Sequence, residues 1–149
     1  MEKATQINSV SGSENEIRKF ISDNVKKYCD ELSLDAMGNL IAHKKGSGKK
    51  IMFAAHMDEI GIIVTDIDDK GFVRFSSVGG LNLRNLVNLR VRFANGVEGV
   101  IGAEEESFKD KPAISKLYVD LGAADKKEAE KTVSIGDTCL LYTSPSPRD

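Results

Sequence analysis

The sequence is poor in cysteine, since Cys29 and Cys139 are the only two among its 149 residues. Their wide separation fits no zinc-finger or redox spacing, which excludes both classes on this evidence and makes a reducing, cytoplasmic setting the expectation. No apolar stretch reaches the ~18 residues of a membrane-spanning helix. The first residues also lack the apolar core of a secretory signal peptide. We therefore expect a cytoplasmic protein without a membrane partner.

Excess charge of either sign is also lacking, because the formal net charge is −2 at pH 7. The composition thus gives no basic surface for nucleic acid or membranes, and neither is expected as a partner. With 40% hydrophobic and 30% charged residues, the chain is typical of a globular protein. The acidic run at residues 104–106 is interpreted as a solvated loop.

The first part of the chain, residues 1–63, has the pattern of one helix followed by strands. Ser13 with Glu16 three residues later is typical of a capping box, and apolar residues then recur at helical spacing. A turn at residues 37–39 predicts a hairpin, and the apolar run at residues 50–55 predicts a buried strand. This order indicates a mixed-sheet α/β layer.

The second part, residues 64–137, has short strands separated by tight turns. Turn signals at residues 68–71 and 95–96 each predict a hairpin. A capping box at residues 125–128 predicts a short helix, and residues 133–137 are expected to close the series of strands. Many short strands with glycine turns are typical of a small barrel.

The last part, residues 138–149, does not match what precedes it. From Ser144 it alternates serine with proline, which removes strand donors and offers no apolar face. We expect this stretch to be a solvated tail, with Ser144 to the end making few contacts.

His56 and Asp58 are the candidate site residues. A histidine at the carboxyl end of a strand, followed two positions later by a carboxylate, is a plausible metal ligand beside its orienting group. The pattern is weak by itself, because composition gives roughly one chance in six of finding it. His43 is interpreted as a surface strand residue, and Asp68 with Asp69 as turn residues.

A series of longer motifs adds to this single pair and spans the chain from Ser9 to Asp137. The motifs lie at residues 9–16, 35–40, 56–61, 70–75, 78–80, 99–102, 120–123 and 133–137. In this order they resemble the glutamyl and deblocking aminopeptidases, which are cytoplasmic dinuclear metallopeptidases that form tetrahedral particles.

The resemblance implies a fold and a division into domains. That family has an α/β/α catalytic domain interrupted by a small β-barrel dimerisation domain. Residues 1–63 would then be the first part of the catalytic domain, residues 64–137 the inserted barrel, and residues 138–149 a divergent tail. The chain would stop before the second, larger half of the catalytic domain, and full-length members form homo-oligomers.

The resemblance also implies a chemistry. The family's site holds two divalent metal ions, often zinc or cobalt, and trims short peptides from their amino ends. His56 corresponds to a metal ligand and Asp58 to the catalytic carboxylate that bonds its ring. The further acidic ligands, the second histidine and the glutamate base have no counterpart here. We therefore expect an incomplete site and an inactive fragment of a metallo-aminopeptidase.

Two other classes of function remain open. The chain could be a non-catalytic binding or oligomerisation module that uses its barrel as an interaction surface, with the histidine and aspartate serving only structure. A carbohydrate hydrolase is a weaker alternative, because no pair of carboxylates stands out at glycosidase-like positions.

Overall fold

The computed structural model describes residues 4, 7–104 and 113–142, and the chain separates into two compact units. The first unit comprises Met1–Ser9 and Ser13–Asp58, and the second comprises Val10–Gly12 and Glu59–Asp149. Within the described ranges, no helix has the length and apolar character needed to cross a membrane.

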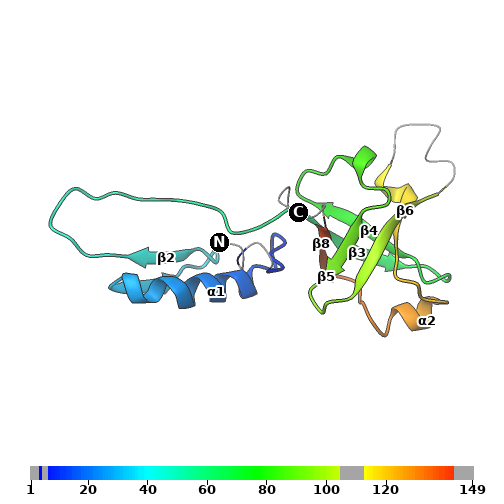
Figure 1. Ribbon diagram of the computed structural model, residues 1–149, viewed down its shortest axis with the longest axis horizontal. Helices are drawn as coiled ribbons and strands as arrows, with labels where there is room; N and C mark the ends of the chain where they lie inside the picture. The colour runs from blue at the N-terminus through cyan, green and yellow to red at the C-terminus, as the bar shows by residue number, and fades with distance from the viewer. Residues whose placement is uncertain (1–3, 5–6, 105–112, 143–149) are drawn as a thin grey trace, which may run out of the picture. The chain divides into compact units, whose positions relative to one another are not determined.

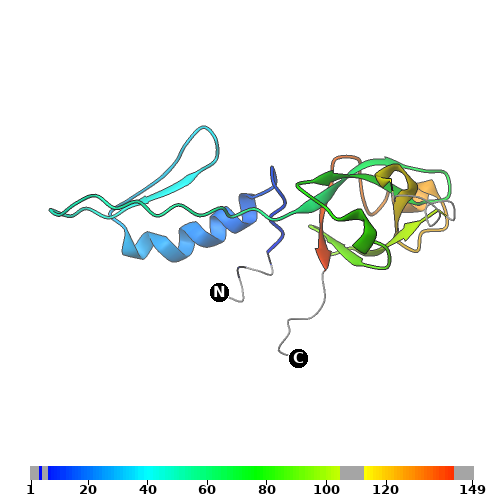
Figure 2. The same cartoon turned by 90° about the horizontal axis from the view of Figure 1, so that it is seen from above.

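The first unit is built from one helix and one hairpin (Figure 1). Helix α1 (Asn15–Val25) continues into the 3₁₀ turn η2 (Lys26–Tyr28), and β1 (Glu31–Leu34) pairs antiparallel with β2 (Leu40–His43). Figure 2 shows the helix running beside this hairpin. Arg18 of α1 joins the two, since its Nε donates a 2.9 Å hydrogen bond to the carbonyl of Gly38 in the hairpin turn.

The helix begins differently from the sequence prediction. Its N-cap is Glu14, whose side chain makes no capping hydrogen bond, so the cap lies one residue after the predicted cap at Ser13. The hairpin turn follows its sequence signal. The carboxylate of Asp35 accepts the backbone N–H groups of Met37 and Asn39, and Gly38 adopts a φ of 84°, which glycine tolerates without a Cβ clash.

The predicted buried strand at residues 50–55 is wrong in this structure, because these residues form neither helix nor strand. Their side chains are highly exposed: Ile51 is 77%, Met52 88% and Phe53 94% accessible. A strand is stable only when its backbone groups pair with a neighbour. Within the described residues nothing pairs with this segment, so its apolar side chains face solvent.

The second unit is a closed, antiparallel six-stranded barrel, and the predicted combination of an α/β segment with a small β-barrel is thereby confirmed. Around the barrel the strand order is β3-β4-β7-β6-β5-β8. The strands are β3 (Gly61–Ile67), β4 (Val73–Val78), β5 (Arg90–Phe93), β6 (Glu98–Ala103), β7 (Leu117–Asp120) and β8 (Thr138–Tyr142). Short helical turns η3 (Leu83–Asn85), η5 (Ile114–Lys116) and α2 (Lys126–Ala129) connect them.

Side chains alternate along these strands between the barrel interior and its outer surface, as the twofold strand period requires. In β4, Val73 and Phe75 are buried while Arg74 lies on the outside. The interior is continuous and apolar, and its buried members are Ile62, Val64, Ile67, Val73, Phe75, Leu86, Val91, Phe93, Ile101, Leu117, Val119, Ala129, Val133 and Cys139.

Local turn chemistry supports this closure. Gly71 and Gly96 have φ values of 83° and 86° at the two predicted hairpin turns, and both predictions are confirmed. The predicted cap of α2 is also confirmed, because the Asp125 side chain accepts the backbone N–H of Glu128.

The carboxyl end of the barrel differs from the sequence prediction. Residues 133–137 form no strand and contain a turn at residues 135–136, and residues 138–142, predicted to belong to a tail, form β8. This strand pairs with both β3 and β5, and Cys139 is fully buried. The predicted tail rested on the serine–proline pattern, which begins only at Ser144. This pattern therefore does not bear on residues 138–142. Residues 143–149, including the expected solvated stretch from Ser144, lie outside the described residues.

Candidate functional site

His56 is held by the residue two positions further along the chain. Its Nδ1 lies 3.1 Å from Oδ1 of Asp58 and 3.0 Å from the backbone oxygen of Asp58. A carbonyl oxygen can only accept a hydrogen bond, and a carboxylate also accepts, so this arrangement places the proton of the neutral ring on Nδ1. The lone pair is then on Nε2, which is the nitrogen left to bind a metal ion.

The ring itself is accessible, since the side chain of His56 is 86% exposed and that of Asp58 is 38% exposed. Both residues lie at a hollow of about 260 Å³ in the first unit. Its lining residues come from α1, from the turn between β1 and β2, and from the segment before Glu59: Glu14, Arg18, Met37, Gly38, Asn39, Ala55, His56, Met57 and Asp58. The structure thus brings the His56 motif beside the glycine turn at residues 35–39.

The chemistry of this donor set can be tested against a metal site. A structural zinc ion takes four protein ligands, and a catalytic one takes three plus water. Among the described residues, no group of three or more histidine, cysteine, aspartate or glutamate side chains could hold a metal ion. The pair therefore fits one imidazole ligand with its orienting carboxylate, and the described residues alone do not complete a metal centre.

The other histidine lies where the sequence placed it. His43 is at the end of β2, its side chain is 56% exposed, and its Nδ1 lies 3.3 Å from Oε2 of Glu31 on the neighbouring strand. The interpretation of His43 as a surface strand residue is confirmed.

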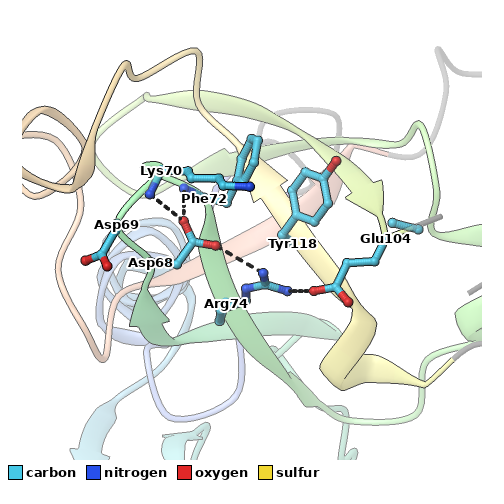
Figure 3. Close-up of a pocket in the computed structure, with 8 residues that line it drawn as sticks. Asp68, Asp69, Lys70, Phe72, Arg74, Glu104 and Tyr118 are labelled. Atoms are coloured by element: carbon cyan, nitrogen blue, oxygen red, sulfur yellow. Dashed lines mark hydrogen bonds and ion pairs between the residues drawn. The ribbon is translucent and has the colours of Figure 1, made fainter. Parts of the chain in front are cut away.

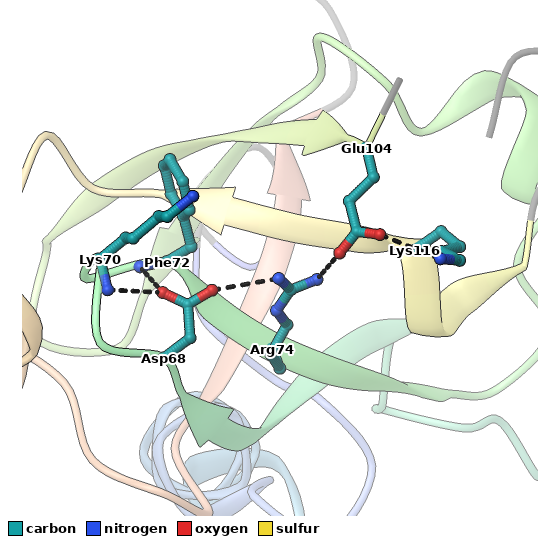
Figure 4. Close-up of polar contacts among 6 residues, drawn as sticks. All are labelled: Asp68, Lys70, Phe72, Arg74, Glu104 and Lys116. Carbon is teal, nitrogen blue, oxygen red and sulfur yellow. Dashed lines mark hydrogen bonds and ion pairs between the residues drawn. The ribbon is translucent and has the colours of Figure 1, made fainter. Parts of the chain in front are cut away.

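Sequence reasoning missed a chain of ion pairs on the outer surface of the barrel (Figure 4). The Arg74 guanidinium donates from Nη2 to Asp68 at 3.0 Å and from Nη1 to Glu104 at 2.9 Å, and Lys116 donates to the second oxygen of Glu104 at 3.2 Å. Asp68 was interpreted as a turn residue. It does serve the turn, since its other oxygen accepts the backbone N–H groups of Lys70 and Phe72.

These contacts shift the ionisation of the chain's members. Hydrogen bonds from Lys116 and then from Arg74 hold the pKa of Glu104 below its usual value. Burial opposes the charge of Arg74, but its hydrogen bonds to Glu104 and Asp68 outweigh burial and raise its pKa. Glu104 is therefore a paired carboxylate: it lies in a loop, as interpreted, but its 38% exposed side chain is held by two cations. The rest of the acidic run, residues 105–106, lies outside the described residues.

A family model described as M42 glutamyl aminopeptidase matches residues 38–147. An inferred aminopeptidase of Acetivibrio thermocellus is 53% identical over 143 residues, which are 95% of this chain and 43% of that protein. The lysyl aminopeptidase of Pyrococcus furiosus is 37% identical over 142 residues, which are 88% of this chain and 41% of that protein.

Solved structures give the same result. The TET1 peptidase of Pyrococcus horikoshii, which can assemble into a tetrahedron or a large octahedral shell, matches with a TM-score of 0.78 and 36% identity over 95% of this chain and 45% of its own. A Thermotoga maritima structure described as an endoglucanase matches with a TM-score of 0.83 and 38% identity over 93% of this chain and 43% of its own. The chain thus spans about two-fifths of the length of the relatives it matches.

Proposed function

The chain belongs to the M42 glutamyl aminopeptidase family, and from that premise we propose that it is part of a metal-dependent aminopeptidase that removes amino-terminal residues from short peptides. The observation that carries the proposal is the contact of Asp58 with Nδ1 of His56, because it leaves Nε2 exposed as a ligand atom. Metal-bound histidines in enzymes commonly donate their other ring nitrogen to a carboxylate in this way.

We assign a role to each of these residues. His56 binds one of two divalent metal ions, zinc or cobalt, through Nε2. Asp58 accepts the Nδ1 proton, which fixes the tautomer of the ring, holds its orientation and raises its basicity as a ligand. Bound metal ions would supply Lewis acidity and a water of lowered pKa. Because the described residues offer one ligand, the 149-residue chain by itself is proposed to be inactive.

The proposal also assigns a separate role to each unit. The first unit would be the beginning of the catalytic domain, and the barrel would provide contacts between subunits in a homo-oligomer. The TET1 peptidase of Pyrococcus horikoshii can assemble into a tetrahedron or a large octahedral shell, which supports the homo-oligomer. A reducing, cytoplasmic location is supported by the free thiols of Cys29 and Cys139.

The test compares this chain with a chimera that completes it with the remaining portion of the Acetivibrio thermocellus relative. Calorimetric titration of this chain with zinc should give only weak binding, since one imidazole is far short of a closed ligand set. The chimera should release a chromophore from an aminoacyl substrate when metal is added. In the chimera, His56→Ala should remove one metal and most activity, and Asp58→Asn should lower turnover by about tenfold or more through the ring orientation.

The sequence supplies a matched control, because His43 is its only other histidine. His43→Ala in the chimera should leave metal content and activity unchanged. Tight stoichiometric zinc binding by the 149-residue chain, or full activity of the His56→Ala chimera, would show that His56 is not a ligand in an incomplete site.

One observation favours a second candidate function, namely carbohydrate hydrolysis. The Thermotoga maritima structure, at 38% identity, carries the description of an endoglucanase. The same chimera should therefore be assayed on a soluble cellulose derivative in parallel with peptides. Release of reducing sugar that is lost in the His56→Ala chimera, without any peptidase activity, would favour that function over the peptidase.

A further inference from the structure

The outer surface of the barrel carries a pocket of about 730 Å³ (Figure 3). This volume lies in the range of small-molecule sites. The pocket forms where the turn after β3 meets the start of β4, the end of β6 and the middle of β7, and its lining residues are Asp68, Asp69, Lys70, Phe72, Arg74, Ala103, Glu104 and Tyr118. None of these residues lines the hollow beside His56.

Two aromatic rings form a fixed wall of this pocket. The ring centroids of Phe72 and Tyr118 lie 4.3 Å apart with planes inclined by 35°. Tyr118 is held from below by Gly102, where an added Cβ would come within 2.5 Å of the ring, and Arg74 lies 5.7 Å from the ring centroid. Because Gly102 has no side chain, the Tyr118 ring lies close against β6. The ring is therefore expected to lose little conformational entropy when a ligand stacks on it.

The charged groups behind this wall satisfy one another. Asp68, Arg74, Glu104 and Lys116 form a continuous series of ion pairs in which two acids balance two bases. A bound molecule would have to break these contacts to use their charges. The series therefore shapes the pocket and does not supply its binding charge.

Two charged residues that line the pocket, Asp69 and Lys70, stand outside this series of ion pairs. The Lys70 side chain extends along the Phe72 ring, with the amine directed toward Tyr118, while the carboxylate of Asp69 points away (Figure 3). Within the described part of the chain, no carboxylate lies within ion-pair distance of the Lys70 amine. Among the described residues, the Lys70 ammonium is thus a positive charge without an ion-pair partner at the edge of an aromatic surface.

We propose that this pocket binds a small aromatic carboxylate. The ring of the ligand would stack on Phe72 and Tyr118, and its carboxylate would pair with the ammonium of Lys70. Aromatic stacking and a charge-assisted hydrogen bond both favour this orientation. Such a ligand could be a free aromatic acid or the carboxyl end of a peptide that terminates in an aromatic residue. The proposal is independent of the metal site at His56.

The test is a titration of the isotope-labelled 149-residue chain followed by NMR. N-acetylphenylalanine represents a peptide carboxyl end, phenylacetate a free aromatic acid, and N-acetylphenylalaninamide the same ring without the charge. We expect saturable shifts of the amides of Phe72, Arg74 and Tyr118, with a Kd on the order of 1 mM for a ligand of this size. The neutral amide should bind about 3- to 5-fold more weakly than its acid.

Variants at Lys70 separate a specific site from general adhesion to aromatic surface. Lys70→Met should weaken binding of either acid about 3- to 5-fold and abolish the preference for the acid over the neutral amide. Lys70→Arg, which keeps the positive charge, should retain the parent's affinity and preference. Lys127→Met, at an exposed lysine of α2, serves as the matched control and should bind like the parent. The proposal is overturned by shifts that do not saturate or that centre elsewhere, by equal affinity for acid and amide, or by tighter binding of phenethylamine.

Discussion

Arg74 is the residue that connects the polar contacts on the outside of the barrel. Its guanidinium joins the turn after β3 to the end of β6, and Lys116 extends the connection to the start of β7. The bonded carboxylates keep their contacts only while they are ionised. The ion pairs are partly exposed, so their effect is best observed as a dependence of stability on pH.

Glu104 gives the clearest pH prediction. Its pKa in the folded chain lies below the ordinary value of 4.5, so the folded state binds fewer protons than the unfolded state near that pH. This contribution to stability is fully present above pH 4.5 and is lost as the pH falls toward the folded pKa. In urea unfolding followed over this acidic window, Glu104→Gln should lose less stability than the parent chain. The control Glu98→Gln, at an exposed position of β6, should show the same pH dependence of stability as the parent. If the free energy of unfolding of Glu104→Gln depends on pH as steeply as that of the parent, the ion-pair account is contradicted.

Gly61 lies where close packing leaves no room for a side chain. A Cβ built at this position would lie 2.5 Å from a methyl group of Val10 and 2.7 Å from the carbonyl oxygen of Cys139. Gly61→Ala should therefore destabilise the barrel by about 1–3 kcal/mol, as overpacking of a close contact does. Gly80→Ala is the matched control, because no atom lies within 4 Å of its Cβ. Equal midpoints in chemical denaturation for both variants would show that Val10 moves aside freely.

At the scale of secondary-structure elements, the hairpins were predictable because their signals are local. Gly71, Gly96 and the Asp35 turn lie where the sequence placed them, since each needs only a few neighbouring residues. The His56–Asp58 contact was predictable for the same reason. Arg74 and Glu104 are 30 residues apart, and only the strand order of the barrel brings them together.

The wrongly predicted strand and the missed strand have a common physical cause. Residues 50–55 have the composition of a buried strand but form no strand. Residues 138–142 were assigned to a tail but form β8. Pairing partners decide the outcome: β8 lies between β3 and β5, whereas residues 50–55 have no partner among the described residues. Composition reports the tendency to form a strand and not the availability of a neighbour.

The unpaired apolar segment has a consequence for solubility. Phe53 is 94% exposed and lies beside the exposed Met52 and Ile51 in an extended segment, which is typical of an aggregation site. Replacing Phe53 with serine should reduce self-association of the purified chain, measured by light scattering over a range of concentrations. Ile135→Ser removes an exposed apolar side chain from a turn of the barrel and should have little effect. A parent chain that stays monomeric at high concentration would contradict this expectation.

At the scale of the whole molecule, buried apolar side chains are concentrated in the barrel. Within the described residues, Ile17 is the only buried hydrophobic side chain of the first unit, whereas the barrel has a continuous buried core. A helix and a two-stranded hairpin are marginally stable in water without such a core. The two units should therefore differ strongly in the free energy of local unfolding.

Hydrogen exchange measures this difference directly. Amides of β3, β5 and β8 should exchange slowly, at rates set by global unfolding of the barrel, because their bonds surround the core. Amides of α1 and of the β1–β2 hairpin should exchange much faster, because opening them exposes little buried apolar surface.

Brief proteolysis should accordingly cut within residues 44–58, which form neither helix nor strand, and leave the barrel intact. Equal protection of both units, or resistance of residues 44–58 to cleavage, would show that the first unit has its own source of stability. Slow exchange confined to the barrel would instead show that the segment carrying His56 is ordered mainly by its short-range contacts.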